Sequence, residues 1–157
     1  MRGKVTRTSR IILPDRVYHS TVVTKLIHRI MLRGQKATAT TIVYKALAKA
    51  EQTLSQPALQ IFEQALKHAA PTVEVRSKRI GGATYQVPME VRPERKSALA
   101  MRWIINASRA TAGKPMQDKL ADQITAAYKN EGAAITKRDE MHRMAEANKA
   151  FAHYARF

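Results

Sequence analysis

The residues best placed to do chemistry are cations around a glycine pair, in the segment VEVRSKRIGGATYQVPMEVRP at 73–93. Six cations lie within or just after this segment: Arg76, Lys78, Arg79, Arg92, Arg95 and Lys96. Such side chains displace counterions from nucleic-acid phosphates, and glycines let a backbone approach a ligand closely. The pattern favours phosphate binding. The alternative is a solvated ribbon whose charges only keep its exposed edges from aggregating.

Two further sets of polar residues could extend such a surface. Arg102, Asn106 and Arg109 recur at helical spacing, so they share one face from which guanidiniums can grip phosphates. The alternative is an ordinary polar helix face. Near the end of the chain, one helical arc is predicted to carry Arg138, His142, Lys149 and His153. Locally, an i, i+4 pair between His142 and Glu146 is the favoured interpretation.

Other kinds of chemistry find no support in the sequence. No P-loop, dinucleotide fingerprint, nucleophile motif or zinc-protease motif is present, and the histidines are scattered over separate elements. The chain contains no cysteine, which excludes disulfides and thiolate metal sites. We therefore expect no enzyme activity, no cofactor and no metal.

Charge dominates the composition. The 157 residues include 28 Lys and Arg against 12 Asp and Glu, a formal net charge of +16. That excess favours a polyanionic partner. The first ten residues contain Arg2, Lys4, Arg7 and Arg10 without an acid, and they are predicted to form an extended cationic arm. No apolar run approaches the roughly 18 residues of a membrane span, so no membrane partner is expected.

The elements that must position these residues follow from the change in hydrophobic period. Apolar residues recur every three or four positions over about 20–32 and 36–54 and after Pro57, which predicts three helices. The period changes to two around Gly81 and Gly82, which predicts a hairpin with a tight turn. Helical periodicity returns after Pro93, is interrupted by AGKP at 112–115, continues in a fifth helix to Gly132, and resumes over about 134–153. The predicted fold is mainly α: a single domain of about six helices with an extended two-stranded β-hairpin between helices three and four.

Two long segments carry a family resemblance. PTVEVRSKRIGGATYQVPMEVRPERKSALAMRWI (71–104) and HRMAEANKAFAHY (142–154) closely resemble the hairpin, following helix and C-terminal helix of the ribosomal small-subunit protein seven family, bacterial or organellar type. ILPD and GQKATA (34–39) resemble its N-terminal third more loosely. Two positions depart from the family pattern: Gln35, where a second lysine is usual, and Arg16, where a proline is common.

The resemblance implies a structural constituent of the small ribosomal subunit. It implies binding to the 3′ major domain of small-subunit rRNA, nucleation of head assembly, and a place near exit-site tRNA and the mRNA exit. Its protein neighbours are expected in the head and, across the cleft, in the platform. It implies one domain over 1–157, with a basic arm at 1–14, the hairpin at 72–92 and a C-terminal helix at 134–154. The expected location is a ribosome of the bacterial cytoplasm, with the plastid or mitochondrial matrix as alternatives.

Residue by residue, the resemblance and the charge patterns predict an RNA surface and a hairpin tip. The predicted rRNA contacts are Arg2, Lys4, Arg7, Arg10, Lys36, Arg76, Lys78, Arg79, Arg92, Arg95, Lys96, Arg102, Arg109, Lys114, Lys137, Arg138, His142 and Lys149. The tip predicted to face tRNA is Ile80, Gly81, Gly82 and Ala83. The rival from another class is an architectural DNA-binding protein, because basic helical bodies with β-ribbon arms also bend duplex DNA.

Overall fold

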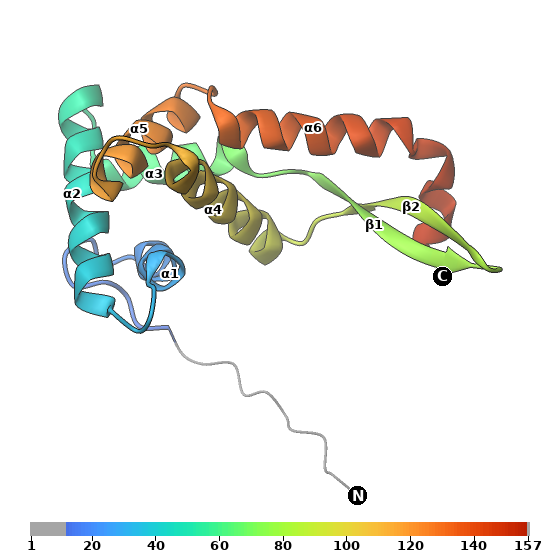
Figure 1. Ribbon diagram of the computed structural model, residues 1–157, viewed down its shortest axis with the longest axis horizontal. Coiled ribbons are helices and arrows are strands. Elements are labelled where there is room, and N and C mark those ends of the chain that lie inside the picture. Colours follow the sequence, from blue (N-terminus) through green and yellow to red (C-terminus); the bar gives the residue numbers. More distant parts are fainter. Residues whose placement is uncertain (1–11, 157) are drawn as a thin grey trace, which may run out of the picture.

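The computed structural model of the chain describes residues 12–156, so most of the predicted arm lies outside the described residues. Within that range, six α-helices and one 3-10 helix accompany a two-stranded antiparallel sheet (Figure 1). The elements are α1 Thr21–Ile30, α2 Lys36–Leu54, α3 Ala58–Ala69, β1 Val73–Ile80, β2 Ala83–Glu90, α4 Pro93–Ala110, α5 Met116–Tyr128, α6 Ala133–Ala147 and η1 Lys149–Arg156. The mainly α class, with a hairpin between the third and fourth helices, is confirmed.

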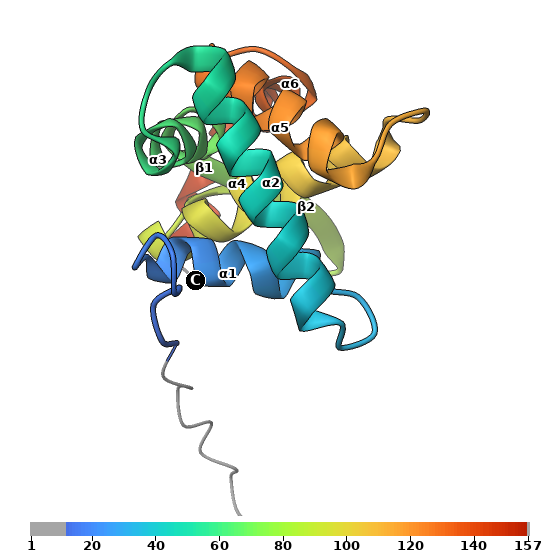
Figure 2. The same ribbon diagram turned by 90° about the vertical axis from the view of Figure 1, so that its left-hand side faces the viewer.

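The first five helices form a compact body around one apolar core. Helix α5 packs against α2, α3 and α4, while α1 packs across α2 and α4 (Figure 2). The largest fully buried side chains in these helices are Phe62, Leu26, Leu47, Ile61, Met101, Ile104, Leu120, Ile124, Val23 and Val43. They lie on the predicted helical stripes, because a surface helix buries the face that repeats every three to four residues.

Local start signals set the beginning of α1 and of α4. Ser20 caps α1, its hydroxyl accepting a hydrogen bond from the Val22 backbone N–H at 3.2 Å. Pro93 occupies the first turn of α4, where a missing N–H costs nothing.

The turn between β1 and β2 contains only Gly81 and Gly82, with φ of +56° and +91°. Left-handed φ values favour glycine at both positions, as predicted. The two-residue turn pairs Ile80 with Ala83 and sets the register down to Val73 opposite Glu90. Alternation from that closing pair places Pro88 in a non-hydrogen-bonded pair, where its missing N–H is harmless.

The register puts the apolar residues of the two strands on opposite faces of the hairpin. Tyr85 and Val87 lie opposite Lys78 and Arg76, because directly paired residues share a face. The valines of β1 lie on the other face. The face that carries Tyr85 and Val87 is covered by α6 and η1, and Val87 is fully buried there.

The single C-terminal helix expected over 134–154 is instead two elements. α6 ends at Ala147, and the 3-10 helix η1 turns back toward the hairpin (Figure 1). At the break, the backbone N–H of Asn148 makes the last helical bond, to the Met144 carbonyl. The side-chain amide of Asn148 also donates to that carbonyl, at 2.8 Å, and a side-chain bond of this kind competes with continued helix. The turn also lets Phe151 and Tyr154 pack on Tyr85, with ring centroids 5.2 and 5.4 Å from it. The predicted arc of Arg138, His142, Lys149 and His153 is therefore wrong, because the last two follow the break.

Candidate nucleic-acid interface

The predicted rRNA contacts divide into three groups by their partners within the protein. Arg2, Lys4, Arg7 and Arg10 lie outside the described residues. Five side chains make no hydrogen bond or ion pair with any residue of 12–156: Lys36, Arg79, Arg92, Lys96 and Arg102. The other nine have a partner inside the protein. Because a nearby carboxylate or carbonyl partner already satisfies part of the charge of a paired cation, the five define the better candidate surface.

Most of this surface lies where the hairpin joins the body. Arg92 immediately precedes α4, Lys96 is in its first turns, and Arg102 is exposed halfway along it. The start of α4, the hairpin and α1 lie along one side of the molecule, the lower side in Figure 1.

A buried carboxylate anchors the base of the hairpin. Glu74 is 4% exposed and accepts hydrogen bonds from Arg76 Nε and Arg95 Nε, both at 2.6 Å. Burial alone would raise the pKa of Glu74, but the two guanidiniums outweigh it and hold the pKa below its ordinary value. Arg76 and Arg95 stay half exposed, so each guanidinium can still present remaining N–H groups outward. The group ties β1 to α4.

Two predicted contacts on α6 point into the protein. Arg138 donates to the His68 carbonyl at 2.6 Å and to Asn130 Oδ1 at 3.0 Å, and its side chain is only 18% exposed. His142 Nε2 accepts a hydrogen bond from the Thr72 backbone N–H at 3.0 Å. That bond replaces the expected pair with Glu146. Both side chains hold α6 against the end of α3 and the beginning of the hairpin.

The remaining paired cations have weaker or more exposed partners. Lys78 donates to the Tyr154 carbonyl at 3.1 Å, and Arg109 to the Ile30 carbonyl at 3.2 Å. Lys114, Lys137 and Lys149 form exposed pairs with Asp122, Glu140 and Glu146. For Lys114, the hydrogen bond to Asp122 raises the pKa.

The tip of the hairpin remains open. Gly81, Gly82 and Ala83 are exposed, and a Cβ built on either glycine would meet nothing within 4 Å. Close packing therefore does not explain the glycine pair; the positive φ values of the turn do. The tip is available to a partner that approaches along the hairpin axis.

A cavity of ≈ 950 Å³ between the loop at 12–20, α1 and the start of α2 is a feature that the sequence patterns missed. We call it the N-terminal cavity. Its lining is Ile12, Leu13, Pro14, Asp15, Arg16, Thr24, Ile27, His28, Lys36, Ala37, Thr40 and Tyr44. These residues come from three separate elements, so no spacing in the sequence brings them together. Only Lys36 among them was a predicted contact.

The wall of this cavity is held by one buried acid. Asp15 accepts hydrogen bonds from the backbone N–H groups of Val17 and Tyr18, each at 3.1 Å, and from the Tyr44 hydroxyl at 2.7 Å. Burial opposes its ionisation, but these bonds outweigh burial and lower the pKa of Asp15. Burial and the neighbouring carboxylate raise the pKa of Tyr44 to about 12, so its hydroxyl remains a donor at neutral pH.

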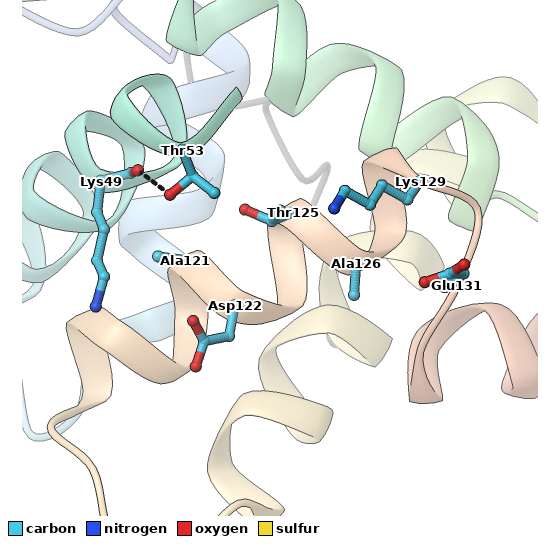
Figure 3. A pocket seen from close by; sticks show the side chains of 8 residues that line it. All are labelled: Lys49, Thr53, Ala121, Asp122, Thr125, Ala126, Lys129 and Glu131. Atoms are coloured by element: carbon cyan, nitrogen blue, oxygen red, sulfur yellow. Dashed lines mark hydrogen bonds between the residues drawn. The ribbon is translucent and has the colours of Figure 1, made fainter. Parts of the chain in front are cut away.

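A second cavity, of ≈ 250 Å³, lies between α2 and α5 (Figure 3). Its lining carries both signs of charge, from Lys49 and Lys129 and from Asp122 and Glu131 (Figure 3). Lys49 is already paired with Asp118 at 3.0 Å. Mixed charge and this pairing make the second cavity a poor phosphate site.

Residues 12–156 contain neither a cluster of metal ligands nor a membrane-spanning helix. This part of the chain contains no group of three or more His, Cys, Asp or Glu side chains arranged to hold a metal ion. Its helices are all too short or too polar to cross a bilayer.

Comparison with known proteins gives one consistent match. The family model described as ribosomal protein S7p/S5e matches residues 2–149. Proteins named small ribosomal subunit protein uS7 are similar over nearly the whole chain. That of Chloroflexus aurantiacus is 52% identical and covers 99% of this chain and 98% of its own length. Those of Synechocystis sp. (53%; 98% and 97%) and Streptococcus pyogenes (48%; 98% and 99%) are similar to the same extent.

Proposed function

The chain belongs to the ribosomal protein S7p/S5e family, and we propose that it anchors the head of the small subunit by binding the 3′ major domain of its rRNA. As a family member it is a structural, non-enzymatic component of a bacterial-type small ribosomal subunit, and it binds rRNA and other ribosomal proteins. The proposal concerns which RNA it holds and with which residues.

The observation that carries the proposal is the set of unpaired cations where the hairpin meets α4. Arg92, at that junction, and Arg102, halfway along α4, are exposed without an internal hydrogen bond or ion pair among the described residues. Unpaired cations neutralise phosphates at no cost in broken protein contacts. We propose that these residues, with Lys36 and Lys96, are the main rRNA contacts of the described chain.

We propose a different role for the cations that have internal partners. Arg76 and Arg95 remain tied to Glu74 and offer their outer N–H groups to phosphate. Arg138 and His142 position α6 and do not bind RNA directly. The exposed pairs at Lys114, Lys137 and Lys149 contribute weakly, since each brings a carboxylate close to the RNA.

A salt titration tests the function. The full chain is titrated with an RNA fragment carrying the head junction of small-subunit rRNA, and with duplex DNA of equal phosphate count. We expect both affinities to fall with salt, at a slope reflecting about six to ten neutralised phosphates. The RNA should keep its advantage near physiological salt, because folded RNA is recognised by shape. Coincident curves would instead favour the architectural DNA-binding alternative.

The hairpin tip is proposed to lie near exit-site tRNA and the outgoing mRNA, and not to anchor the rRNA. A variant lacking residues 77–84 keeps the paired strand positions Arg76 and Val87, and the two residues that follow the deletion form the new turn between them. We expect its affinity for the junction RNA to fall by less than about tenfold, since none of the proposed main rRNA contacts lies in the deleted segment. Reconstituted subunits that carry it should show altered retention of exit-site tRNA. A loss of junction binding as large as that of a body variant would contradict this division of roles.

A further inference from the structure

We propose that the N-terminal cavity receives one unstacked base of single-stranded or junction RNA, with the flanking phosphates held by Arg16 and Lys36. This inference rests on the proposed function and goes beyond it by assigning a base-binding site. Its volume of ≈ 950 Å³ lies within the roughly 300–1,000 Å³ of cavities that hold small organic ligands.

The charge of the lining selects an anionic occupant. Arg16, His28 and Lys36 lie at the cavity, and none of them makes a hydrogen bond or ion pair with another residue in the described range. Among the described lining residues the one acid is Asp15, which is buried and accepts three hydrogen bonds from its own loop and Tyr44. The free charge at the cavity is therefore positive.

The apolar and planar side chains of the lining suit a flat, partly apolar group. Ile12, Ile27 and Ala37 supply apolar surface, and Leu13 at the same site is 73% exposed. His28 and Arg16 add planar groups of the kind on which unstacked bases stack. A bare phosphate would leave this apolar surface exposed to water, whereas a nucleotide covers it while its phosphate meets the cations.

The cavity is preformed, so the protein loses little conformational entropy when a ligand binds. Tyr44 is fixed by its hydrogen bond to Asp15 and by an edge-on contact with Tyr18, with ring centroids 5.9 Å apart. The Thr24 hydroxyl donates to the Leu13 carbonyl at 2.9 Å and ties the loop to α1. A rigid receptor pays less entropy on binding.

The basic segment that precedes the cavity is an unfavourable occupant. Residues 1–11 contain four cations and no acid. Like charges at Arg16 and Lys36 would repel this segment. An RNA segment has the complementary charge.

The test compares an RNA octamer of mixed sequence with an abasic octamer of the same length and phosphate count, using the full chain. In wild type we expect the intact octamer to bind about tenfold more tightly, as expected for one stacked base. Backbone NMR signals of Ala37, Thr40 and Tyr44 should shift with the intact octamer and much less with the abasic one. Equal affinities and equal shifts would mean purely electrostatic binding and would overturn the proposal.

Two neighbouring substitutions on α2 localise the effect. Ala37→Phe fills the cavity, whereas Thr38→Phe adds the same ring to an exposed position outside the lining. We expect A37F to abolish the preference for the intact octamer and T38F to retain it, with circular dichroism reporting folding of both. Arg16→Gln tests the proposed phosphate contact and should weaken the binding of both octamers. Equal behaviour of A37F and T38F, or nuclear Overhauser contacts between Ala37 and residues 1–11 in the free protein, would overturn the proposal.

The junction RNA separates failure of this site from failure of the proposed function. If wild type binds the junction RNA with its expected advantage over DNA but shows no preference between octamers, the base site is absent and rRNA anchoring stands. If the junction advantage itself is missing, the proposed function fails, whatever the octamers show.

Discussion

Replacing Lys36, Arg92 and Arg102 together by glutamine is expected to weaken binding to the head-junction RNA about 100-fold or more at 0.1 M salt. Each neutralised phosphate releases counterions, and at that salt each release contributes close to a factor of ten to the affinity. The slope of log affinity against log salt concentration should become shallower by about 0.7–0.9 for each phosphate contact that is lost, and we expect two to three contacts to be lost. Fluorescence anisotropy over a range of salt concentrations measures both quantities.

The matched control removes the same net charge from paired positions. Lys114, Lys137 and Lys149 each lie within 3.2 Å of a carboxylate oxygen on the protein surface. Their replacement by glutamine is expected to reduce affinity much less, because these cations are already shared with Asp122, Glu140 and Glu146. Equal losses in the two triple variants would show that only total charge matters and would remove the assignment of individual contacts.

The second large effect is expected from Glu74→Gln. The substitution leaves Arg76 and Arg95 side by side without the buried carboxylate that neutralises them. We expect a loss of about 2 kcal/mol in the free energy of unfolding, since one partner of a nearly buried ion pair is removed while both guanidiniums keep access to water. In a chain of this size that corresponds to a fall in Tm of about 4–8 °C.

Glu90→Gln is the control for this variant. Glu90 lies on the same hairpin but is exposed and outside the Glu74 group. Its substitution should change the free energy of unfolding by no more than about 0.5 kcal/mol. If E74Q proves as stable as E90Q in urea unfolding, Glu74 does not anchor the hairpin.

The stability difference between wild type and E74Q is also expected to depend on pH. The folded-state pKa of Glu74 is lowered from its ordinary value of 4.5 because the bonds from Arg95 and Arg76 outweigh the cost of burial. The stability that it contributes is therefore fully present above about pH 4.5 and is lost as the pH falls through the folded-state pKa. The difference in stability between wild type and E74Q should narrow as the pH falls below about 4.5 and through the folded-state pKa. A constant difference over that pH range would contradict the conclusion that Glu74 is ionised in the folded protein.

The helical body and the hairpin turn could be predicted because local rules decide them. The stripes that include Leu26, Leu47 and Phe62 repeat with the helical period, and that period identifies the buried face. Gly81 and Gly82 specify a two-residue turn by their φ values. Once that turn is fixed, the register follows, including the placement of apolar residues of β1 and β2 on opposite faces.

The C-terminal break is an example of what local rules leave open. The sequence over 134–154 is compatible with one continuous helix. Burial of Phe151 and Tyr154 against Tyr85, about 70 residues away along the chain, favours the turn after Ala147 instead. A long-range contact of this kind has no local pattern, so tertiary packing overrode helix propensity.

The sequence by itself determined the fold class, the family and the positive charge that requires a polyanionic partner. Only the tertiary structure decided which cations are available. It ties Arg76 and Arg95 to Glu74 and turns Arg138 and His142 inward. Within residues 12–156 it gives the side chains of Arg92 and Arg102 no hydrogen bond or ion pair. Charge is a property of each residue and can be read one position at a time. Pairing depends on atoms from elements distant in the sequence, which only folding brings within hydrogen-bond distance.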